Sequence, residues 1–376
     1  MLRVFEAFAG YGSQRMALRN SGIPYEIVGI SEIEGNVLLS YAAIHTGFLK
    51  LRDDPSVCPE TEEEMRKYLL ERNVPLDYKT FQNRAENLKG RELKDMYLAN
   101  KLSKNFGDIR TIDPGQLPDF DLFTYSFPCQ DISVAGYQYG LKENSGTRSS
   151  LLWECCKIIE KKKPPYLMME NVKNLVGKNH IRNFSKFLNY LESIGYRNFW
   201  SVLNAKDYGV PQNRERVFCI SMLDPKAEYI FPEKTELKKT MKEYLERDVS
   251  KSFYLRCLSD IPIDQDVCYC IDSNYWKGST IENFFEKRRR QLITTHQTEN
   301  GKYLIRRLTP REAWRLMGCS DEDFEKAASL NSNTNLYRQA GNSIVVPVLE
   351  AVFEALFKSG KDDRRKTARG HQYSLL

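Results

Sequence analysis

The sequence predicts an α/β fold in two domains, with an insertion in the first. Short apolar runs alternate with helical patterns through most of the chain, which is typical of β-α-β units. The first apolar run leads through a glycine turn into a helix, as nucleotide-binding units do. The length of 376 residues exceeds that of one typical core and favours two domains.

The first β-α-β unit has the features of a nucleoside site. Residues 4–8 are expected to form a strand, and Gly10 and Gly12 in the following turn let the backbone approach a ligand closely. A second strand over residues 25–30 leads to Glu32, which is placed to bind two ribose hydroxyls. Neither G-x-x-x-x-G-K-[ST] nor the full G-x-G-x-x-G is present, so a nucleoside without a pyrophosphate fits better.

A charged stretch separates this unit from the rest of the sheet. After an expected helix over residues 34–45, residues 46–106 far exceed the roughly 2–6 residues usual for connections in α/β units. We therefore expect an insertion with short helices of its own. Gly107, Asp108 and Ile109 then resume the strand pattern, and Asp108 is positioned to accept a hydrogen bond from a base amino group.

Cys129 is the candidate nucleophile. An apolar strand over residues 120–127 ends at Pro128, which leaves Cys129 at a strand tip, where ligands bind in α/β sheets. Lone cysteines are more often small core residues, and we interpret the other eight in that way. None of the four histidines has a convincing Cys–His context, which argues against a protease-like pair. The polar segment 131–148 that follows is expected to be a lid.

Charged side chains also accompany the later strands. Glu170 ends a buried strand over residues 165–169 and could act with Cys129; the alternative is a capping or salt-bridged glutamate. Arg214 and Arg216 precede a strand over residues 217–222. Their alternation on an extended segment points them to the same side, and two guanidinium groups suit a phosphate or a base carbonyl. Helices over 151–159 and 181–194 and a strand over 199–204 complete the pattern.

Residues 223–303 lose the alternation of strands and helices. They combine many aromatic residues with the basic cluster Lys287-Arg288-Arg289-Arg290, which suits nucleic acid; a small aromatic core explains the aromatic residues equally well. A well-capped helix is expected to begin at Thr309, with Pro310 and Glu312 in its first turn. Gly341-Asn342-Ser343 precedes an apolar helix over residues 344–357.

Composition sets outer limits on function. The net charge of +6 and the pI near 8.7 permit an anionic partner. Nine scattered cysteines suit a reducing compartment, and Cys257, Cys268 and Cys270 lack the second pair or histidine of a zinc site. Neither a signal-peptide pattern nor an apolar run of membrane-spanning length is seen. A cytoplasmic protein without a metal or membrane is expected.

Seven motifs in order resemble the DNA (cytosine-5) methyltransferases, especially the bacterial and phage restriction–modification type. They are Phe8-Ala9-Gly10-x-Gly12, Glu32, Gly107-Asp108-Ile109, Phe127-Pro128-Cys129-Gln130, Glu170-Asn171-Val172, Gln212-x-Arg214-x-Arg216 and Gly341-Asn342-Ser343. Each motif is modest alone, but their order makes the match specific. The resemblance covers most of the chain outside residues 46–106 and 223–303.

The resemblance implies a doubly wound, mostly parallel, Rossmann-like sheet that binds S-adenosylmethionine and releases S-adenosylhomocysteine. Residues 1–222 would form the catalytic domain, residues 223–303 a small target-recognition domain, and residues 304–376 a return to the catalytic domain followed by a basic tail. The cofactor would contact Phe8, Gly10, Tyr11, Gly12, Glu32, Ile33, Asp108, Ile109, Pro128, Asn342 and Ser343. Catalysis would fall to Cys129, Glu170, Arg214 and Arg216, and DNA contacts to Gln130, Ser133, Lys287, Arg288, Arg289 and Arg290.

The same resemblance implies a mechanism. Cys129 would add to carbon 6 of a cytosine flipped out of the duplex, and Glu170 would bind the N3 and amino edge of the ring. Arg214 would hold the base carbonyl, and Arg216 would orient Glu170 or the loop. Carbon 5 would take the methyl group and lose its proton to water, which releases the cysteine.

Two departures from the family pattern and two alternative functions accompany this interpretation. Ser13 stands where the family often has a glycine, and Ile33 where an aromatic residue commonly stacks on the adenine. The insertion could extend the DNA contact or act as a stabilising cap. The alternatives are tRNA methylation, whose Cys-Phe-Thr signature is not found, and a regulatory DNA-binding protein with an inactive site, which the intact motifs argue against. A monomer in a bacterial or phage-infected cell is expected, with double-stranded DNA as partner and a restriction endonuclease genetically linked but unbound.

Overall fold

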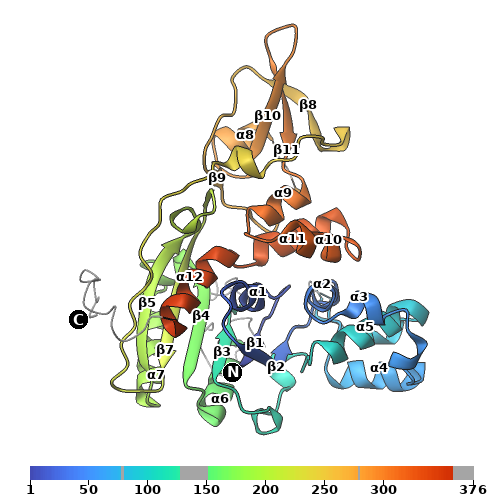
Figure 1. The fold of residues 1–376 in the computed structure, drawn as a ribbon, viewed down its shortest axis with the longest axis vertical. Helices are drawn as coiled ribbons and strands as arrows, with labels where there is room; N and C mark the ends of the chain where they lie inside the picture. Colours follow the sequence, from blue (N-terminus) through green and yellow to red (C-terminus); the bar gives the residue numbers. More distant parts are fainter. Residues whose placement is uncertain (78–79, 128–150, 278–279, 359–376) are drawn as a thin grey trace.

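A computed structural model describes residues 1–77, 80–127, 151–277 and 280–358 of the chain. Its centre is a six-stranded sheet in the order β2-β1-β3-β4-β7-β5 (Figure 1). The strands are β1 (Leu2–Ala7), β2 (Tyr25–Ser31), β3 (Leu122–Tyr125), β4 (Tyr166–Val172), β5 (Arg197–Asn204) and β7 (Glu215–Met222). Strands β2, β1, β3 and β4 are parallel, and β7 runs antiparallel to both β4 and β5. The expected mostly parallel α/β sheet is confirmed.

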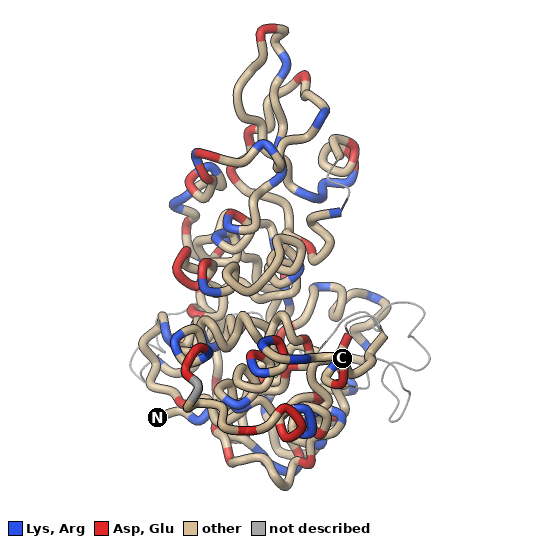
Figure 2. The backbone as a smooth tube through the Cα atoms, turned by 90° about the vertical axis from the view of Figure 1, so that its right-hand side faces the viewer, with Lys and Arg blue, Asp and Glu red and all other residues tan. Residues whose placement is uncertain are grey.

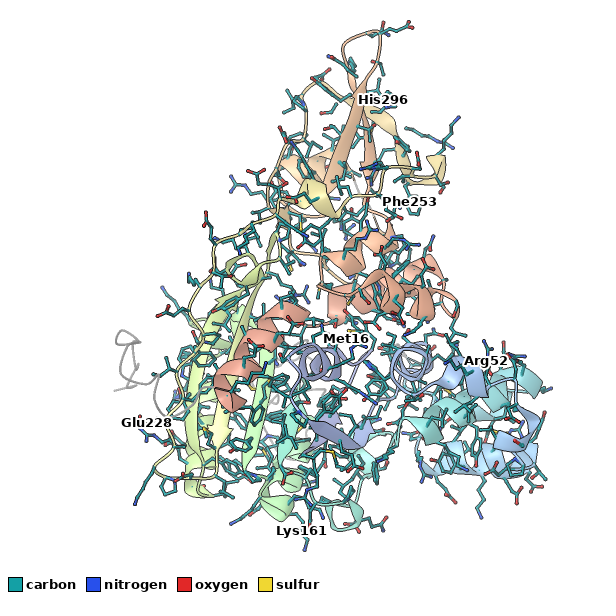
Figure 3. All side chains as sticks on the ribbon, viewed as in Figure 1. Met16, Arg52, Lys161, Glu228, Phe253 and His296 are labelled. Atoms are coloured by element: carbon teal, nitrogen blue, oxygen red, sulfur yellow. The ribbon has the colours of Figure 1, made fainter. Side chains whose placement is uncertain are left out.

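Helices cover both faces of this sheet, as parallel strands require. Successive strand residues point to opposite faces, so Val4 and Leu122 join one apolar core while Phe5 and Phe123 join the other. The first face carries α1 (Ser13–Asn20), α2 (Gly35–His45) and α12 (Val346–Phe357), and the second carries α6 (Leu151–Lys162) and α7 (Ile181–Ser193). Met16 on α1 lies near the centre of the molecule, between the sheet and the C-terminal helices (Figure 3).

The expected strand at residues 107–109 is not formed. Ile109–Thr111 is instead a short 3-10 helix, capped by the Asp108 carboxylate, which accepts from the Arg110 N–H. Shortly before this 3-10 helix, Asn105 forms an isolated parallel bridge with Ile30 of β2. The physical reason is a close contact with the insertion, because the Asp108 N–H donates to the Arg72 carbonyl at 3.0 Å.

The insertion forms helices that join the main core. They are α3 (Phe48–Leu51), α4 (Glu62–Glu71) and α5 (Gly90–Leu102), to the right of the sheet in Figure 1. A capping box between Thr61 and Glu64 begins α4. Buried Leu69, Leu93 and Met96 belong to the same apolar core as α2. The insertion therefore packs against the first β-α-β unit over a continuous apolar surface.

A second, three-stranded antiparallel sheet forms the upper projection in Figure 1. It has the order β10-β11-β8, with β8 (Tyr254–Ser259), β10 (Leu292–Gln297) and β11 (Tyr303–Arg307), and α8 (Ile281–Phe285) packs on it. Phe284, Leu292 and Ile305 form its small core, and Tyr269 packs against Phe284 with ring centroids 5.3 Å apart. His296 in β10 lies far from Lys161 in α6 (Figure 3). The predicted boundary after residue 303 falls within β11.

The last helices return to the first sheet. They are α9 (Pro310–Arg315), α10 (Asp321–Ala328), α11 (Asn333–Asn342) and α12. The predicted capping box of Thr309 and Glu312 is confirmed at the start of α9. By length and apolar composition alone, the segment Asn333–Phe357 could cross a membrane. Here Val346, Leu349 and Phe353 on α12 are instead buried in the main core.

Candidate active site

A cavity of about 360 Å³ lies where the parallel strands end. Such volumes are typical of small-molecule sites, and the carboxyl ends of parallel strands are where ligands of α/β sheets bind. Its lining comes from the ends of β1, β2, β3 and β4, the start of β7 and the end of α11. It brings together these predicted residues: Phe8, Gly10, Tyr11, Glu32, Ile33, Glu170, Arg214, Arg216, Asn342 and Ser343.

The glycine turn after β1 packs against the side chain of His45. Gly12 has a φ of 86°, and a Cβ there would collide with the His45 ring, so glycine is required at this position. His45 Nε2 lies 3.0 Å from the Tyr11 carbonyl oxygen and forms a hydrogen bond with it. The Tyr11 ring stacks on Trp314, with ring centroids 4.3 Å apart. Gly12 therefore shapes the turn without itself lining the cavity.

Glu32 fixes the turn and keeps one acceptor position. Its Oε1 accepts the N–H groups of Ile33 and Glu34 at 2.8 Å, and its Oε2 accepts the N–H of Gly10 at 3.0 Å. Each carboxylate oxygen has two lone pairs, so Oε2 can still accept one hydrogen bond. Burial and the Glu34 carboxylate raise the pKa of Glu32 to about 7, although the three backbone N–H donors lower it.

Glu170 and Arg216 form the charged pair of the cavity. Arg216 Nε lies 3.3 Å from Glu170 Oε1, and the Glu170 side chain is 9% exposed. Burial raises the pKa of Glu170, and the two nearby guanidinium groups of Arg216 and Arg214 lower it only in part. A carboxyl of this kind can donate a hydrogen bond or share a proton with a bound group. Glu170 is therefore salt-bridged, which was the alternative to a catalytic role, and it also lines the cavity.

Asn171 connects β4 to the strand end that leads to the candidate nucleophile. Its Nδ2 donates to the Phe127 carbonyl at 3.1 Å, and its Oδ1 accepts from the Val172 N–H at 2.9 Å. Asn171 is 3% exposed. The residues Pro128, Cys129, Gln130 and Ser133, and the predicted lid over 131–148, lie outside the described residues. The anchor at Phe127 is the last described point before them.

Arg214 binds three backbone carbonyls in two segments. Its Nη1 donates to the Ile271 carbonyl at 2.7 Å, and its Nη2 donates to the carbonyls of Gly341 and Ser343 at 2.9 and 2.5 Å. Its Nε is buried without a partner among the described residues. The predicted contact to a base carbonyl can therefore use Nε, because the other nitrogens already hold the protein together.

The C-terminal segment closes the cavity against the first helix. Ser343 Oγ lies 2.7 Å from Ser13 Oγ, so Ser13 uses the hydroxyl that a glycine would lack. A Cβ on Gly341 would collide with the backbone of Asp272 and Ser273, which cross beside it. Asn342 and Ser343 thus reach the cavity through a contact that only glycine permits.

Asp108 and Ile109 lie apart from the described cavity lining, although both are buried. The Asp108 carboxylate accepts from Asn73 Nδ2 at 2.9 Å and from the backbone and side chain of Arg110. A hydrogen bond from Asp108 to a base amino group would require this pair to open. Contact of both residues with adenine stays a prediction. The hydrogen bonds that the Asp108 carboxylate already accepts oppose such a contact.

Two of the four residues in the basic cluster at 287–290 form ion pairs. Lys287 pairs with Glu282 at 2.9 Å, and Arg289 pairs with Asp272 at 3.1 Å. In the part of the chain that the structure describes, Arg288 and Arg290 have no ion pair. All four residues lie outside the cavity lining. No group of three His, Cys, Asp or Glu residues in the described ranges is arranged to hold a metal.

The cavity also contains residues that the sequence did not single out. Arg338 on α11 pairs with Glu34 at 2.8 Å, and both line the cavity with Val37 and Gln339. Phe81 reaches it from the insertion. Position after a strand end could have pointed to Glu34. Val37 lies one helical turn after Ile33, and Arg338 and Gln339 lie within one turn before Asn342. Phe81 is distant in sequence from the motif residues and follows no strand, so no local signal could have marked it.

Comparison with known proteins finds matches over nearly the whole chain. The family model described as C-5 cytosine-specific DNA methylase matches residues 64–358. The chain is 66% identical over 361 residues to the type II methyltransferase M2.ScrFI of Lactococcus lactis subsp. cremoris, covering 96% of this chain and 100% of that protein. It is 34% identical over 380 residues to the orphan methyltransferase M.SssI of Spiroplasma monobiae, covering 94% and 97%. The fold is similar to that of S. pombe Dnmt2 methyltransferase, with a TM-score of 0.63, 19% identity, and 95% and 99% of the two chains covered.

Proposed function

The chain belongs to the family of C-5 cytosine-specific DNA methylases, and from this premise we propose its substrate, cofactor and mechanism. It transfers a methyl group from S-adenosylmethionine to carbon 5 of a cytosine that is flipped out of a specific double-stranded DNA sequence. The reaction passes through a covalent bond between Cys129 and carbon 6 of that cytosine. As in restriction–modification systems, the modified DNA would be protected from a cognate endonuclease that does not bind this chain.

One observation carries the proposal: a single cavity joins a ribose acceptor to a catalytic acid. At one end Glu32 keeps a free lone pair beside the glycine turn, which suits a ribose hydroxyl. At the other end Glu170 and Arg216 form a buried pair. Phe127, two residues before Cys129, lines the cavity between them. These residues fit an adenosyl cofactor, and when bound it supplies an electrophilic methyl group on a sulfonium and leaves as S-adenosylhomocysteine.

The residues of the chain perform the remaining chemistry. The Cys129 thiolate adds to carbon 6, which breaks the 5,6 double bond and places its electron pair on carbon 5. Glu170 hydrogen-bonds the N3 edge of the ring, so the charge pushed into the ring is stabilised as it forms. Burial raises the pKa of Glu170, which suits this role because a carboxyl with a raised pKa shares a proton with a bound ring more readily. Carbon 5 uses this electron pair to form its bond to the methyl group, whose bond to sulfur breaks. Loss of the carbon 5 proton to water then restores the 5,6 double bond and expels the cysteine as a thiolate.

A methyl-transfer assay tests this proposal. With a labelled methyl donor, we expect transfer to duplex DNA and none to tRNA. Cys129→Ala should abolish transfer, and Glu170→Gln should lower kcat by about 10² to 10⁴-fold, the usual contribution of acid–base groups. Both variants should still bind S-adenosylhomocysteine. Glu215→Gln is the matched control, because Glu215 also lies on this sheet edge but pairs with Lys173 outside the cavity.

Four results would contradict parts of the proposal. Turnover by Cys129→Ala would remove the covalent step. Full activity of Glu170→Gln would remove the carboxyl from the mechanism. Transfer to tRNA in place of duplex DNA would favour the RNA-modifying alternative, and no transfer to either would favour an inactive DNA-binding protein.

A further inference from the structure

We propose that Phe81, which the insertion supplies, forms the aromatic wall on which the adenine of the cofactor stacks. The insertion is then part of the cofactor site, and its role is neither DNA contact nor capping alone. This inference rests on the proposed function, because it assumes an adenosyl cofactor in the cavity. It assigns to Phe81 a binding role that the sequence pattern did not indicate.

The order of the strands fixes which end of the cavity receives the adenine. Glu170 follows the path of β4 and Glu32 follows β2, and three strand spacings separate β2 from β4, about 14 Å. The methyl group must reach the cytosine beside Glu170. With the ribose at Glu32, the base therefore lies at the β2 end, beyond the ribose. Ile33, Val37 and Phe81 line the cavity with apolar side chains there.

The insertion is joined to this end by backbone hydrogen bonds. The Leu76 N–H donates to the Ile33 carbonyl at 2.9 Å, directly after the ribose acceptor. Four residues beyond Asp77, the Phe81 N–H donates back to the Asp77 carbonyl at 2.9 Å, and the Asp77 N–H donates to the Gln82 carbonyl at 3.0 Å. Backbone hydrogen bonds at Leu76 and Asp77 thus link Phe81 to Ile33, the residue that follows Glu32.

Among the aromatic residues of the cavity, Phe81 is the one suited to a base at this end. The Tyr11 ring is committed to Trp314. Phe8 belongs to the glycine turn after β1, and Phe127 follows β3 toward the catalytic pair. Phe81 is half-buried and lines the cavity together with Ile33. A purine needs a flat apolar surface, which a phenylalanine ring offers.

The charged side chain of Arg110 packs over the ring of Phe81 and helps to hold it in place. The Arg110 guanidinium carbon lies 5.7 Å from the Phe81 ring centroid, within the range of a cation–π contact. Arg110 is in turn fixed by the Asp108 carboxylate through backbone and side-chain hydrogen bonds. Phe81 also adopts a φ of 55°, which bulky residues rarely do unless their surroundings hold them there. Asp108 would then act on the adenine indirectly, as a positioning residue for Phe81.

Binding of S-adenosylhomocysteine to the full chain, measured by calorimetry, tests the inference. Phe81→Leu keeps an apolar side chain and removes the ring, and we expect its Kd to rise between about 5-fold and about 100-fold, the range for loss of base stacking. Tyr68→Leu is the matched control: Tyr68 is an insertion aromatic with Arg72 over its ring at 3.7 Å, but it lies outside the cavity lining. Its Kd should equal that of the wild type.

A second variant separates stacking from misfolding. Phe81→Trp keeps an aromatic ring, so it should bind with a Kd near that of the wild type. Stacking on adenine should also quench its added tryptophan fluorescence when S-adenosylhomocysteine is titrated, beyond any change in the wild type. Wild-type binding together with an unchanged Kd for Phe81→Leu, or an unquenched Phe81→Trp, overturns this inference alone. Absence of binding to the wild type overturns the proposed function and this inference together.

Discussion

Three glutamates, in β1, in β4 and directly after β2, have raised pKa values for one shared reason. Burial raises the pKa of Glu6 and of Glu32 to about 7, and it also raises the pKa of Glu170. Their partners differ: Tyr41 donates to Glu6, backbone N–H groups donate to Glu32, and Arg216 faces Glu170. Desolvated carboxyls gather at functional sites because such pKa values suit proton exchange near neutral pH. Glu6 differs from the others because it does not line the cavity.

Glu6 leads to a prediction about stability and pH. Its Oε2 accepts from Tyr41 Oη at 2.7 Å, and its Oε1 has no partner within the described residues; Arg15 is the nearby cation. A carboxyl whose pKa rises from 4.5 to about 7 on folding binds its proton more tightly in the folded state. It therefore stabilises the protein below pH 4.5, and this contribution is lost as the pH rises toward 7. At about 1.4 kcal/mol per pKa unit, the loss reaches about 3 kcal/mol.

Denaturant unfolding at a series of pH values measures this effect. Glu6→Gln cannot titrate, so its free energy of unfolding should fall by less than that of the wild type between pH 4.5 and 7.5. Glu32 contributes the same slope to both proteins, and the difference between them isolates Glu6. Glu26→Gln, at an exposed glutamate paired with Lys104, should follow the wild type. Parallel curves for Glu6→Gln and the wild type would show that Glu6 does not titrate in this range.

At the scale of elements, the cavity depends on how closely α11 approaches the segment leading to the upper sheet. Gly341 lies in α11 directly against the backbone of Asp272 and Ser273. Arg214 binds both sides of this contact, through the carbonyls of Ile271 and Gly341. One glycine and one arginine therefore join the first sheet, the C-terminal helices and the segment around Asp272.

Gly341→Ala tests this contact without a backbone penalty, because Gly341 does not adopt a positive φ. The added methyl group meets backbone atoms that cannot rotate away, so we expect a loss of about 1–3 kcal/mol in the free energy of unfolding. S-Adenosylhomocysteine binding should weaken as well, since Asn342 and Ser343 would shift. Gly115→Ala is the control, because only the Asp113 side chain approaches that position. Equal stability of the two variants would mean that the segments separate without cost.

Sequence reasoning located the elements of the sheet because their signals are local. Apolar runs ended at Glu32 and Glu170, and the Thr309 capping box began its helix, all within a few residues of the structure. It failed at Asp108, where the pattern resembled a strand end. The outcome there depends on Arg72, which the insertion brings from elsewhere in the chain. Partners chosen by tertiary contact leave no mark on the local pattern.

The candidate site shows the same division between local and distant information. The motif residues that line the cavity follow strand ends and could be predicted. Phe81 could not, because it reaches the cavity through packing of a segment far from the motifs in sequence, whereas Arg338 lies one helical turn before Asn342. The backbone partners of Arg214 were equally hidden. Its place in an extended segment predicted a free guanidinium, whereas the folded chain uses most of its donors internally.

For the whole molecule, the cavity is closed by both ends of the described chain. Ser343 meets Ser13, Arg338 meets Glu34, and Gln339 accepts from Ser40 at 2.8 Å. Each pair joins α11, or the residue after it, to the first β-α-β unit. The cavity therefore exists only once the polypeptide has returned from the second sheet to its first sheet.

In the upper projection, which contains the second sheet, residues of opposite charge are mixed along the chain. Figure 2 shows Lys and Arg alternating with Asp and Glu along the upper projection, and ion pairs such as Lys302–Asp260 and Lys242–Asp264 account for part of this mixing. Paired cations lose much of their attraction for phosphates. The unpaired members of the basic cluster should therefore carry more of the binding to DNA than the paired ones.

Salt dependence of DNA binding distinguishes the two halves of the cluster. Each lysine or arginine that neutralises a phosphate steepens the slope of log K against log salt by about 0.9. Replacing Arg288 and Arg290 by Gln should reduce the slope by nearly two and weaken binding at low salt. Replacing Lys287 and Arg289 should change it less, because Glu282 and Asp272 already neutralise them. Binding to duplex DNA across a range of salt concentrations, with S-adenosylhomocysteine present, measures both slopes. Equal slopes for the two double variants would mean that the ion pairs open on DNA, and unchanged slopes in both would remove the cluster from the interface.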